Sequence, residues 1–448
     1  MAPRITIIGA GSAVFSLSLI RDLCLTPNLS GSTVVFMDID PDRLDVVYNL
    51  CRRYATEVGT QLYLESSTDR RQALQGADFV VNTALAAGHH RLREGWDKAR
   101  KLGYRLGGSL HVMHDEAFWI NFYQIRLFEE VLQDIMELCP DAWYLQVANP
   151  VLAGITYLSR KYPQVQMVGL CHGFSGVYHL ADVLKLDRDK LTFQVPGVNH
   201  HVWLTHIYHN GQDVFPLLED WIAQEAPAYW ENCGWSDDLG PKAIDLYRRF
   251  GVFPIGDTCT PGGGSWPWWY HTSEEVERCW REDPAGWWQR YFQWGESKVR
   301  QMAQLAADPN ARLIDHFPPK ASGEVMVPMM ESLYFDVPKV LIGNVPNTHE
   351  FVPGLPRDIA VEVPLLASRR GLEPVHTDGL PGPVIDHILR DRVAPVNMEL
   401  AAYEHGSLEL LRQLVLMDPW TRSEEQAAKL VEEILSLPGH EAMREHYR

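Results

Sequence analysis

The sequence lacks three features: paired cysteines, a long apolar run and an excess of positive charge. Its seven cysteines are an odd number within 448 residues and show no Cys-x-x-Cys spacing, so a disulfide framework is not expected. No apolar run reaches the roughly 20 residues that cross a bilayer, and the first residues read as a strand rather than as a secretory signal. These absences predict a soluble, cytoplasmic protein without a membrane partner.

The charge balance narrows the range of partners. With 40 Lys and Arg against 58 Asp and Glu, the formal net charge is −18. Nucleic-acid binders carry a basic face, so no nucleic-acid partner is expected. The net charge does not exclude an anionic small ligand, because a few arginines in a cleft set the local electrostatic field. With 46% hydrophobic and 22% charged residues, the chain has the composition of a globular protein long enough for two domains.

Short apolar runs alternate with helical patterns through the first part of the chain. The runs are RITIIGAG, TVVFMDID, ADFVVNTAL, AWYLQVANP and VQMVGLCHG, and segments such as DRLDVVYNLCRRYATEV separate them. This alternation predicts a doubly wound parallel sheet. After about residue 200, long helical patterns and Trp-rich loops follow. We therefore expect an α/β protein resembling lactate and malate dehydrogenases, with a Rossmann-type NAD-binding domain over 1–195 and a mixed α+β substrate, metal and oligomerisation domain over 196–448.

The end of the first strand has the features of a nucleotide-binding turn. Gly9 and Gly11 allow a pyrophosphate to approach the backbone where the next helix begins, although Val14 replaces the third glycine of the usual pattern. Asp38 ends the second strand, where a carboxylate binds ribose hydroxyls and repels a 2′-phosphate, which favours NAD over NADP. For a lone motif, glycines that serve only the turn are an equal alternative. The predicted NAD contacts are Gly9, Gly11, Ser12, Phe15, Asp38, Asn82 and Thr83.

Polar residues also stand at or just after other predicted strand ends. They include Asp115, Asn149, Cys171 and His200. A Cys171 thiolate and a neutral His200 imidazole would suit Mn²⁺, Ni²⁺, Co²⁺ or Fe²⁺ and leave positions open for a substrate. Taken singly, a free cysteine is more commonly a small buried hydrophobe, and a histidine more commonly a core or surface residue, than a metal ligand. The residues alone leave both interpretations open.

A set of motifs through nearly the whole chain resembles the family 4 glycoside hydrolases, which are NAD- and divalent-metal-dependent glycosidases. The motifs are GAGSAVF (9–15), VANP (147–150), GLCHG (169–173), GVNHHVW (197–203), FGVFPIGD (250–257), GNVPNTHEFVPGLPRDIAVEVP (343–364) and MELAAYEHGSLELLRQLVLMDP (398–419). Most glycoside hydrolases cleave their substrates with a pair of carboxylates, and this NAD-dependent family is an exception, because hydride transfer to NAD⁺ comes first.

The resemblance implies roles for single residues. Cys171 and His200 would bind the metal, Mn²⁺ or another divalent ion, and Asn149 would bind substrate hydroxyls. Asp257 would be the base, although Thr258 and Cys259 follow it where the family's α-glycosidases usually have Arg-His; Tyr270 is the alternative base. His172 and Asp115 are further catalytic candidates near the sugar.

The reaction implied for an α-glycoside begins with oxidation at sugar carbon 3 by NAD⁺. Proton abstraction from carbon 2, elimination at carbon 1, addition of water and re-reduction would follow, so that NAD⁺ is regenerated. Members of the family commonly form dimers or tetramers, which implies a homodimer or homotetramer here.

The expected substrate is an α-uronide, because His-Gly after the ligand cysteine resembles family members that act on α-glucuronides and α-galacturonides. Arg91, with Arg93 and Arg105, could bind the sugar carboxylate. A neutral α-glucoside or α-galactoside is the alternative within the family. Outside it, a lactate- or malate-like 2-hydroxy-acid dehydrogenase and a catalytically silent sugar or NAD sensor also stay open. The 15 tryptophans would serve packing more readily than sugar stacking.

Overall fold

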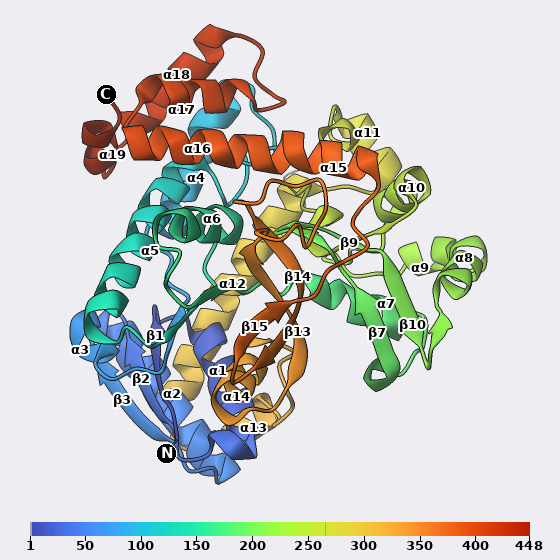
Figure 1. Cartoon of the computed structure of the whole chain (residues 1–448). Coiled ribbons are helices and arrows are strands. Elements are labelled where there is room, and N and C mark those ends of the chain that lie inside the picture. Colours follow the sequence, from blue (N-terminus) through green and yellow to red (C-terminus); the bar gives the residue numbers. More distant parts are fainter. Residues whose placement is uncertain (1, 265) are drawn as a thin grey trace.

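The computed structural model describes residues 2–264 and 266–448. Its first half contains a parallel sheet with the strand order β3-β2-β1-β4-β5-β6 (Figure 1). This order confirms the predicted doubly wound fold. The strands are β1 (Arg4–Ile8), β2 (Thr33–Met37), β3 (Tyr63–Ser67), β4 (Phe79–Asn82), β5 (Trp143–Gln146) and β6 (Met167–Gly169). The sequence did not reveal β3, because this edge strand reads YLESS and is largely exposed.

Helices connect these parallel strands. In α2 (Pro41–Val58), the Asp40 side chain caps the first turn and Gly59 ends the helix with a φ of 80°. One face of α2 packs into the core through residues such as Leu44, Val47 and Leu50. The other helices of this half are α1 (Ala13–Cys24), α3 (Arg70–Leu74), α4 (Gly88–Lys101), α5 (Phe118–Leu138), α6 (Val151–Lys161) and α7 (Gly176–Val183).

The main sheet continues into the second half of the chain. β13 (Lys339–Pro346) pairs antiparallel with β6, and β14, β8, β9 and β12 follow in space. These strands are β8 (Gly197–Val198), β9 (His201–Leu204), β12 (Phe253–Ile255) and β14 (Ala360–Ser368), with β15 (Gly371–Pro374) paired to β14. A smaller antiparallel sheet contains β7 (Leu191–Gln194), β10 (His206–His209) and β11 (Gln212–Asp213). The second half is therefore mixed α+β, as expected.

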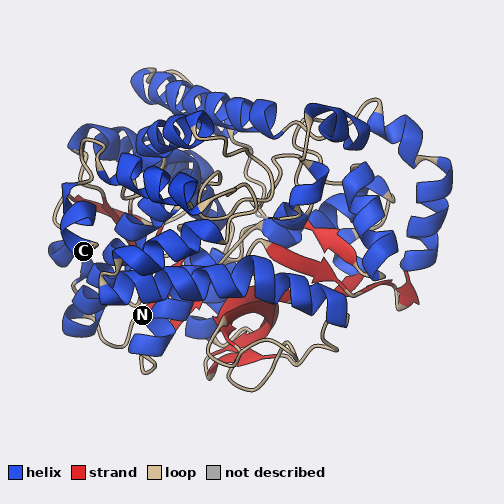
Figure 2. Cartoon of the chain, turned by 90° about the horizontal axis from the view of Figure 1, so that it is seen from above, coloured by secondary structure: helices blue, strands red, loops and turns tan. Residues whose placement is uncertain are grey.

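Helices enclose the strands from several sides (Figure 2). Among the helices of the second half, α12 (Pro284–Ala307) packs against α1 and α2 and so joins the two halves. The others are α8 (Phe215–Gln224), α9 (Ala226–Trp230), α10 (Pro241–Phe250), α11 (Glu274–Trp280), α13 (Leu313–His316), α14 (Met326–Phe335), α15 (Gly382–Ile388), α16 (Ala394–His405), α17 (Leu408–Leu416), α18 (Glu424–Leu435) and α19 (Glu441–His446). Among the described residues, no helix combines the length and the apolar character that a bilayer span needs.

The Trp-rich loop before α11 serves packing. Trp266 is 1% exposed and stacks on His201 with 4.3 Å between the ring centroids, and Trp203 and Phe250 lie around it. The domain boundary after residue 195 and the expected homodimer or homotetramer stay predictions.

Candidate active site

The turn after β1 passes close to two neighbouring strands. The backbone N–H groups of Gly9 and Ala10 both donate to the carbonyl of Met37, at 2.9 Å each. Gly9 has a φ of 82°, and a Cβ there would lie 2.5 Å from the Cα of Ala84. A Cβ on Gly11 would lie 2.7 Å from Oδ2 of Asp38. Gly9 therefore requires glycine, as a backbone that approaches a ligand closely does, and a Cβ on Gly11 would displace the Asp38 carboxylate.

The amino end of α1 suits an anion. Ser12 makes no side-chain cap and the first turn carries no acidic residue, so the first N–H groups stay available. Asp38 accepts from the Gly11 N–H at 2.7 Å and from the Asp40 N–H at 3.0 Å, through different oxygens. Each carboxylate oxygen has a further lone pair for a ribose hydroxyl. Phe15 lies on α1 and is 37% exposed. These residues fit an NAD site.

Asn82 and Thr83 act on the turn itself. Asn82 is fully buried; its amide donates to the Tyr144 hydroxyl at 2.8 Å and accepts from the Ala84 N–H at 3.1 Å. The Thr83 hydroxyl donates to the carbonyl of Ile8 at 3.2 Å. The Asn82 side chain is thus directed into the protein and shapes the loop, and its contact with the cofactor stays a prediction.

The structure brings together three side chains from separate motifs. Cys171 follows β6, His200 lies between β8 and β9 with a φ of 61°, and Asp257 lies in a 3₁₀ turn after β12. The Cys171 thiol and the His200 ring are close enough to shift each other's pKa. Nε2 of His200 lies 3.3 Å from Oδ2 of Asp257. Positive φ at a non-glycine residue is strained and is concentrated at functional sites.

A buried carboxylate supports the other side of the His200 ring. Nδ1 of His200 lies 2.8 Å from Oε1 of Glu116, within ion-pair distance although not aligned as a hydrogen bond. Glu116 also faces the buried guanidinium of Arg392, whose Nη2 is 3.5 Å away and donates to the Asn199 carbonyl at 2.8 Å. Histidine ligands of metals commonly have such a carboxylate on the nitrogen that does not face the metal. No sequence motif indicated Glu116 or Arg392.

The charges of this group suit a cation. Burial raises the pKa of Cys171, and the Glu362 carboxylate raises it further. Burial lowers the pKa of His200, but Asp257, Cys171 and Glu116 outweigh it and place this pKa well above its usual value. The pair therefore holds protons that a divalent metal would displace, because thiolate and neutral imidazole are the binding forms.

Unpaired oxygen atoms lie beside the cysteine. The side-chain amides of Asn199 and Asn344 donate to Oε2 of Glu362, at 3.2 and 3.1 Å. Within residues 2–264 and 266–448, Oδ1 of both asparagines and Oε1 of Glu362 are buried without a hydrogen-bond partner. Buried polar atoms normally have partners, so these oxygens point to a missing cation, water or hydroxyl. The thiol, imidazole and oxygen donors fit a divalent transition metal.

Asp115 and Tyr291 lie near the group formed by Cys171, His200 and Asp257. Oδ1 of Asp115 is 2.8 Å from Nδ1 of His114, whose ring centroid lies 6.2 Å from that of His200. Tyr291 on α12 is within reach of the charges on Asp115, Asp257 and His200; burial and the two carboxylates raise the pKa of its hydroxyl to about 12. No sequence motif indicated Tyr291.

Tyr270, the alternative base, lies elsewhere. Its ring is 1% exposed and its hydroxyl donates to Oδ2 of Asp245 at 2.5 Å. Burial and Asp245 raise the pKa of Tyr270 beyond its usual range. This hydroxyl already has a strong acceptor.

A cavity of about 590 Å³ opens onto the group, and its lining includes Cys171, His172, His179, Asp237, Asp238 and Asp257. The His172 side chain is 49% exposed, and its Nδ1 lies 3.4 Å from Oε1 of Glu324, which raises its pKa. Asn149 follows β5, the strand next to β6, so it shares the same edge of the sheet.

The structure does not bring Arg91 to this cavity. Its guanidinium lies over the ring of Tyr123, 4.9 Å from the centroid, and beside the backbone of Gly439. Arg93 pairs with Glu296 at 3.7 Å, and Arg105 with Glu277 at 3.7 Å.

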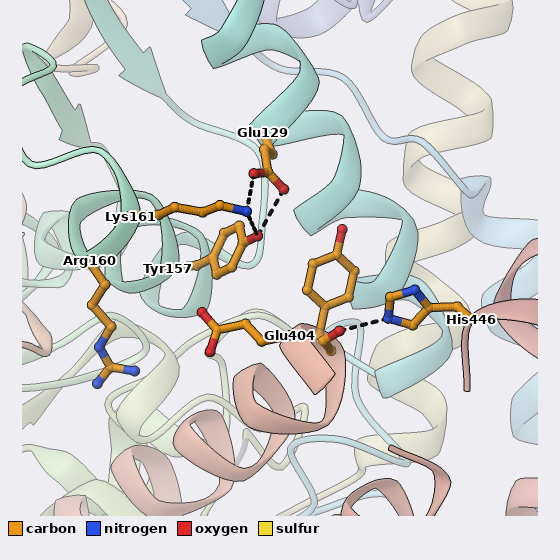
Figure 3. Close-up of a pocket in the computed structure, with 7 residues that line it drawn as sticks. Glu129, Tyr157, Arg160, Lys161, Glu404 and His446 are labelled. Atoms are coloured by element: carbon orange, nitrogen blue, oxygen red, sulfur yellow. Dashed lines mark hydrogen bonds and ion pairs between the residues drawn. The ribbon is translucent and has the colours of Figure 1, made fainter. Parts of the chain in front are cut away.

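A separate cavity of about 580 Å³ lies among α5, α6, α16 and α19 (Figure 3). There, Glu129 accepts from the Tyr157 hydroxyl at 2.8 Å and from the Tyr162 hydroxyl at 2.6 Å, and pairs with Lys161 at 2.6 Å. Nε2 of His446 lies 2.7 Å from the Tyr403 carbonyl. Glu129 and Lys161 satisfy each other, so this cavity lacks the reactive donor set found around Cys171.

Comparisons with known proteins show what the whole chain is similar to. A model described as "Family 4 glycosyl hydrolase" matches residues 4–186, and one described as "Family 4 glycosyl hydrolase C-terminal domain" matches residues 195–421. The α-glucosidase of Erwinia rhapontici is 26% identical, with 97% of this chain and 98% of that protein aligned. The α-galacturonidase of Lachnoclostridium phytofermentans is 24% identical, with 96% and 95% aligned.

Among solved structures, a 6-phospho-α-glucosidase from gut microorganisms in complex with NAD and Mn²⁺ has a TM-score of 0.79 at 16% identity. The superposition covers 100% of this chain and 99% of that chain, which shows a shared fold. Because the two family models together match most of the sequence, the protein belongs to family 4 of the glycosyl hydrolases.

Proposed function

We propose that the protein is an NAD- and divalent-metal-dependent α-glycosidase. The observation that carries this proposal is that the buried His200 ring lies beside Cys171 and Asp257, and both of these residues line one cavity. Cys171 follows β6, at the carboxyl edge of the sheet where the Gly9–Ser12 turn also lies, and doubly wound folds bind ligands at that edge. The names of the α-glucosidase and α-galacturonidase relatives and the NAD and Mn²⁺ of the 6-phospho-α-glucosidase support it.

We propose a set of binding residues for each cofactor. Gly9, Gly11, Asp38 and the amino end of α1 would hold NAD, and Cys171 and His200 would hold Mn²⁺ or a similar ion. When bound, NAD⁺ supplies a reversible hydride acceptor for sugar carbon 3, and the cation supplies a Lewis acid for the sugar oxygens.

Asp257 is the proposed base for the proton on carbon 2. Its side chain is 39% exposed and lines the cavity, so a substrate reaches it directly. A carboxylate can remove a proton next to a carbonyl group when positive groups stabilise the developing charge. Asp115 and His172 are the proposed groups for proton transfer to the leaving oxygen. Tyr270 is the weaker candidate for the base, because its hydroxyl is occupied by Asp245.

The proposed glycone is a uronic acid. The open His172 imidazole lies in the cavity beside Cys171, where it can pair with a sugar carboxylate. One observation favours a neutral hexoside instead. Asp237, Asp238 and Asp257 also line the cavity, and none of its lining residues in the described part of the chain is Lys or Arg. Aspartates bind sugar hydroxyls well but repel a carboxylate.

A panel of nitrophenyl α-glucuronide, α-galacturonide, α-glucoside and α-galactoside tests the proposal, with NAD⁺, Mn²⁺ and thiol present. Release of nitrophenol without net NADH is the expected result, and the best glycone identifies the substrate class. Net NADH would instead indicate a dehydrogenase, and binding without turnover a sensor. Cys171→Ser should abolish metal-dependent turnover while NADH binding is kept; unchanged Mn²⁺ affinity would refute the ligand role.

A further inference from the structure

Four aromatic rings form a row beside the candidate active site. Trp287, Tyr291 and Trp294 follow one another at helical spacing on one face of α12. The rings of Trp287 and Tyr291 are stacked, with centroids 5.3 Å apart and planes 7° apart, and Tyr291 and Trp294 are 6.3 Å and 28° apart. Trp235 packs edge-on against Trp287 at 5.7 Å. Trp235 and Trp294 are 39% and 46% exposed, so the row presents apolar rings to solvent.

Anchoring of the helix accounts for the inner rings only in part, since Trp287 packs on Trp288 at 5.0 Å and Tyr291 packs on Trp288 at 5.6 Å and on His89 at 6.4 Å. Trp235 and Trp294 stay exposed. A different face of α12 anchors the helix through Trp288, which is 7% exposed and packs on Trp96 at 5.2 Å and on His114 at 6.0 Å. Phe292 on that same face packs on Trp96 and His89. The exposed rings are therefore left for another role, since large exposed aromatics that lie together commonly mark binding sites.

The row begins at the candidate active site. Tyr291 is within reach of the charges on Asp115, Asp257 and His200. Trp235 stands between Gly234 and Ser236, which line the same cavity as Cys171 and Asp257. Gly262 makes room for the row, because a Cβ there would lie 2.8 Å from the Trp287 ring. A ligand in the cavity would thus continue onto these rings.

Hydrogen-bond donors accompany the rings. Arg290 lies over the Trp235 ring, 5.7 Å from its centroid, and its Nη2 binds Asp283 at 2.9 Å. Nε of Arg290 and Nε1 of Trp287 are buried and have no hydrogen-bond partner in residues 2–264 and 266–448. Buried donors are costly without an acceptor, and sugar hydroxyls would supply one once the Arg290 and Trp287 side chains turn toward the ligand.

We propose that Trp235, Trp287, Tyr291 and Trp294 form a stacking platform for the leaving-group sugars of the substrate. The C–H faces of pyranose rings pack on aromatic rings, while their hydroxyls bind the donors at the edge. The protein would therefore prefer α-linked oligosaccharides to glycosides with a small leaving group. This inference rests on the proposed glycosidase function.

Trp294→Ala tests the platform, because Trp294 is the exposed end of the row. We would measure kcat/KM for the nitrophenyl α-glycoside that the panel identifies and for α-1,4-linked tri-galacturonate and maltotriose. Loss of one stacking ring should lower the ratio of trisaccharide to nitrophenyl kcat/KM about 3- to 10-fold, through KM. Tyr208→Ala removes another exposed ring, on β10 (37% exposed, against 46% for Trp294), and should leave the ratio as it is. An unchanged ratio in Trp294→Ala would overturn the platform.

Binding separates this inference from the proposed function. Calorimetric titration of the full chain with each trisaccharide should give about 3- to 10-fold weaker binding to Trp294→Ala than to the wild type, whether or not turnover occurs. Absence of hydrolysis with this difference present would refute only the glycosidase proposal. A second copy of the chain is the other occupant to test: if Trp294→Ala dissociates an oligomer in sedimentation and leaves trisaccharide affinity unchanged, the row is a subunit interface and the platform is wrong.

Discussion

Replacing Glu116 by glutamine would test how the protein holds His200. Glu116 is 1% exposed, and its Oε1 lies 2.8 Å from Nδ1 of His200. Glutamine keeps the size of the side chain and removes its charge. If His200 binds the metal through Nε2, the change would loosen the ring and lower its basicity without touching the ligand atoms themselves.

The expected loss of Mn²⁺ affinity is about 10- to 100-fold, as for other carboxylates behind a histidine ligand. This corresponds to about 1.4 to 2.8 kcal/mol. A structural effect accompanies it, because fully buried Arg392 loses a charge partner 3.5 Å away. Arg392 keeps its 2.8 Å bond to the Asn199 carbonyl, so we expect a loss of unfolding free energy nearer about 3 than 5 kcal/mol.

Titration calorimetry with Mn²⁺ would measure the metal affinity of the wild type and of Glu116→Gln. The NADH affinity of both proteins would check that the nucleotide site is intact. Glu129→Gln is the matched control, because it removes a half-buried carboxylate that pairs with Lys161 in the separate cavity (Figure 3). It should lower thermal stability and leave Mn²⁺ affinity as it is. A folded Glu116→Gln protein that binds Mn²⁺ within twofold of the wild type would refute the assignment of His200 as a supported ligand.

Three further predictions address other parts of the protein. Asp257→Asn should stop exchange of the carbon 2 hydrogen with solvent deuterium, followed by NMR; continued exchange would move the base to another group. Gly9→Ala would place a Cβ 2.5 Å from the Cα of Ala84, so it should weaken NADH binding at least about tenfold and lower stability by about 1–3 kcal/mol. Gly59→Ala is the control, because no atom lies within 4 Å of a Cβ at that position, and it should leave the NADH affinity measured by fluorescence titration unchanged. Burial raises the pKa of Asp418 from 3.8 to about 6, so the folded state holds this proton more tightly and stability falls by up to about 3 kcal/mol as pH rises from about 4 to 6. Asp418→Asn should lack this loss, and equal Tm changes in both proteins between these pH values would contradict it.

Some features of the protein could be predicted from the sequence, and others depend on contacts between distant parts of the chain. The apolar runs that became β1, β2, β4, β5 and β6 were readable, because buried parallel strands are continuously hydrophobic. β3 was not readable, since an edge strand can be polar. The pairing of Cys171 with His200 could be predicted only because the motifs around them resemble those of a known family.

Glu116, Arg392 and Tyr291 could not be found in this way. Each is an ordinary residue within a helix or loop, and only its neighbours in space distinguish it. One signal was present: a Glu in the apolar-flanked segment HVMHDEAF suggests a buried charge, which needs a partner. The identity of that partner, more than 270 positions further along the chain, depends on the packing of α16 and the π-helical turn before it.

By itself, the sequence determined the parallel sheet, the glycine turn after β1 and the chemical types of the donors, because these depend on local periodicity and on the atoms of single side chains. Only the tertiary structure decided which donors meet. Cys171, His200 and Asp257 converge because β6, β8, β9 and β12 belong to one sheet, whereas Arg91, a further candidate from the sequence, lies against Tyr123. Long-range strand pairing and side-chain packing set these distances, and no local pattern records them.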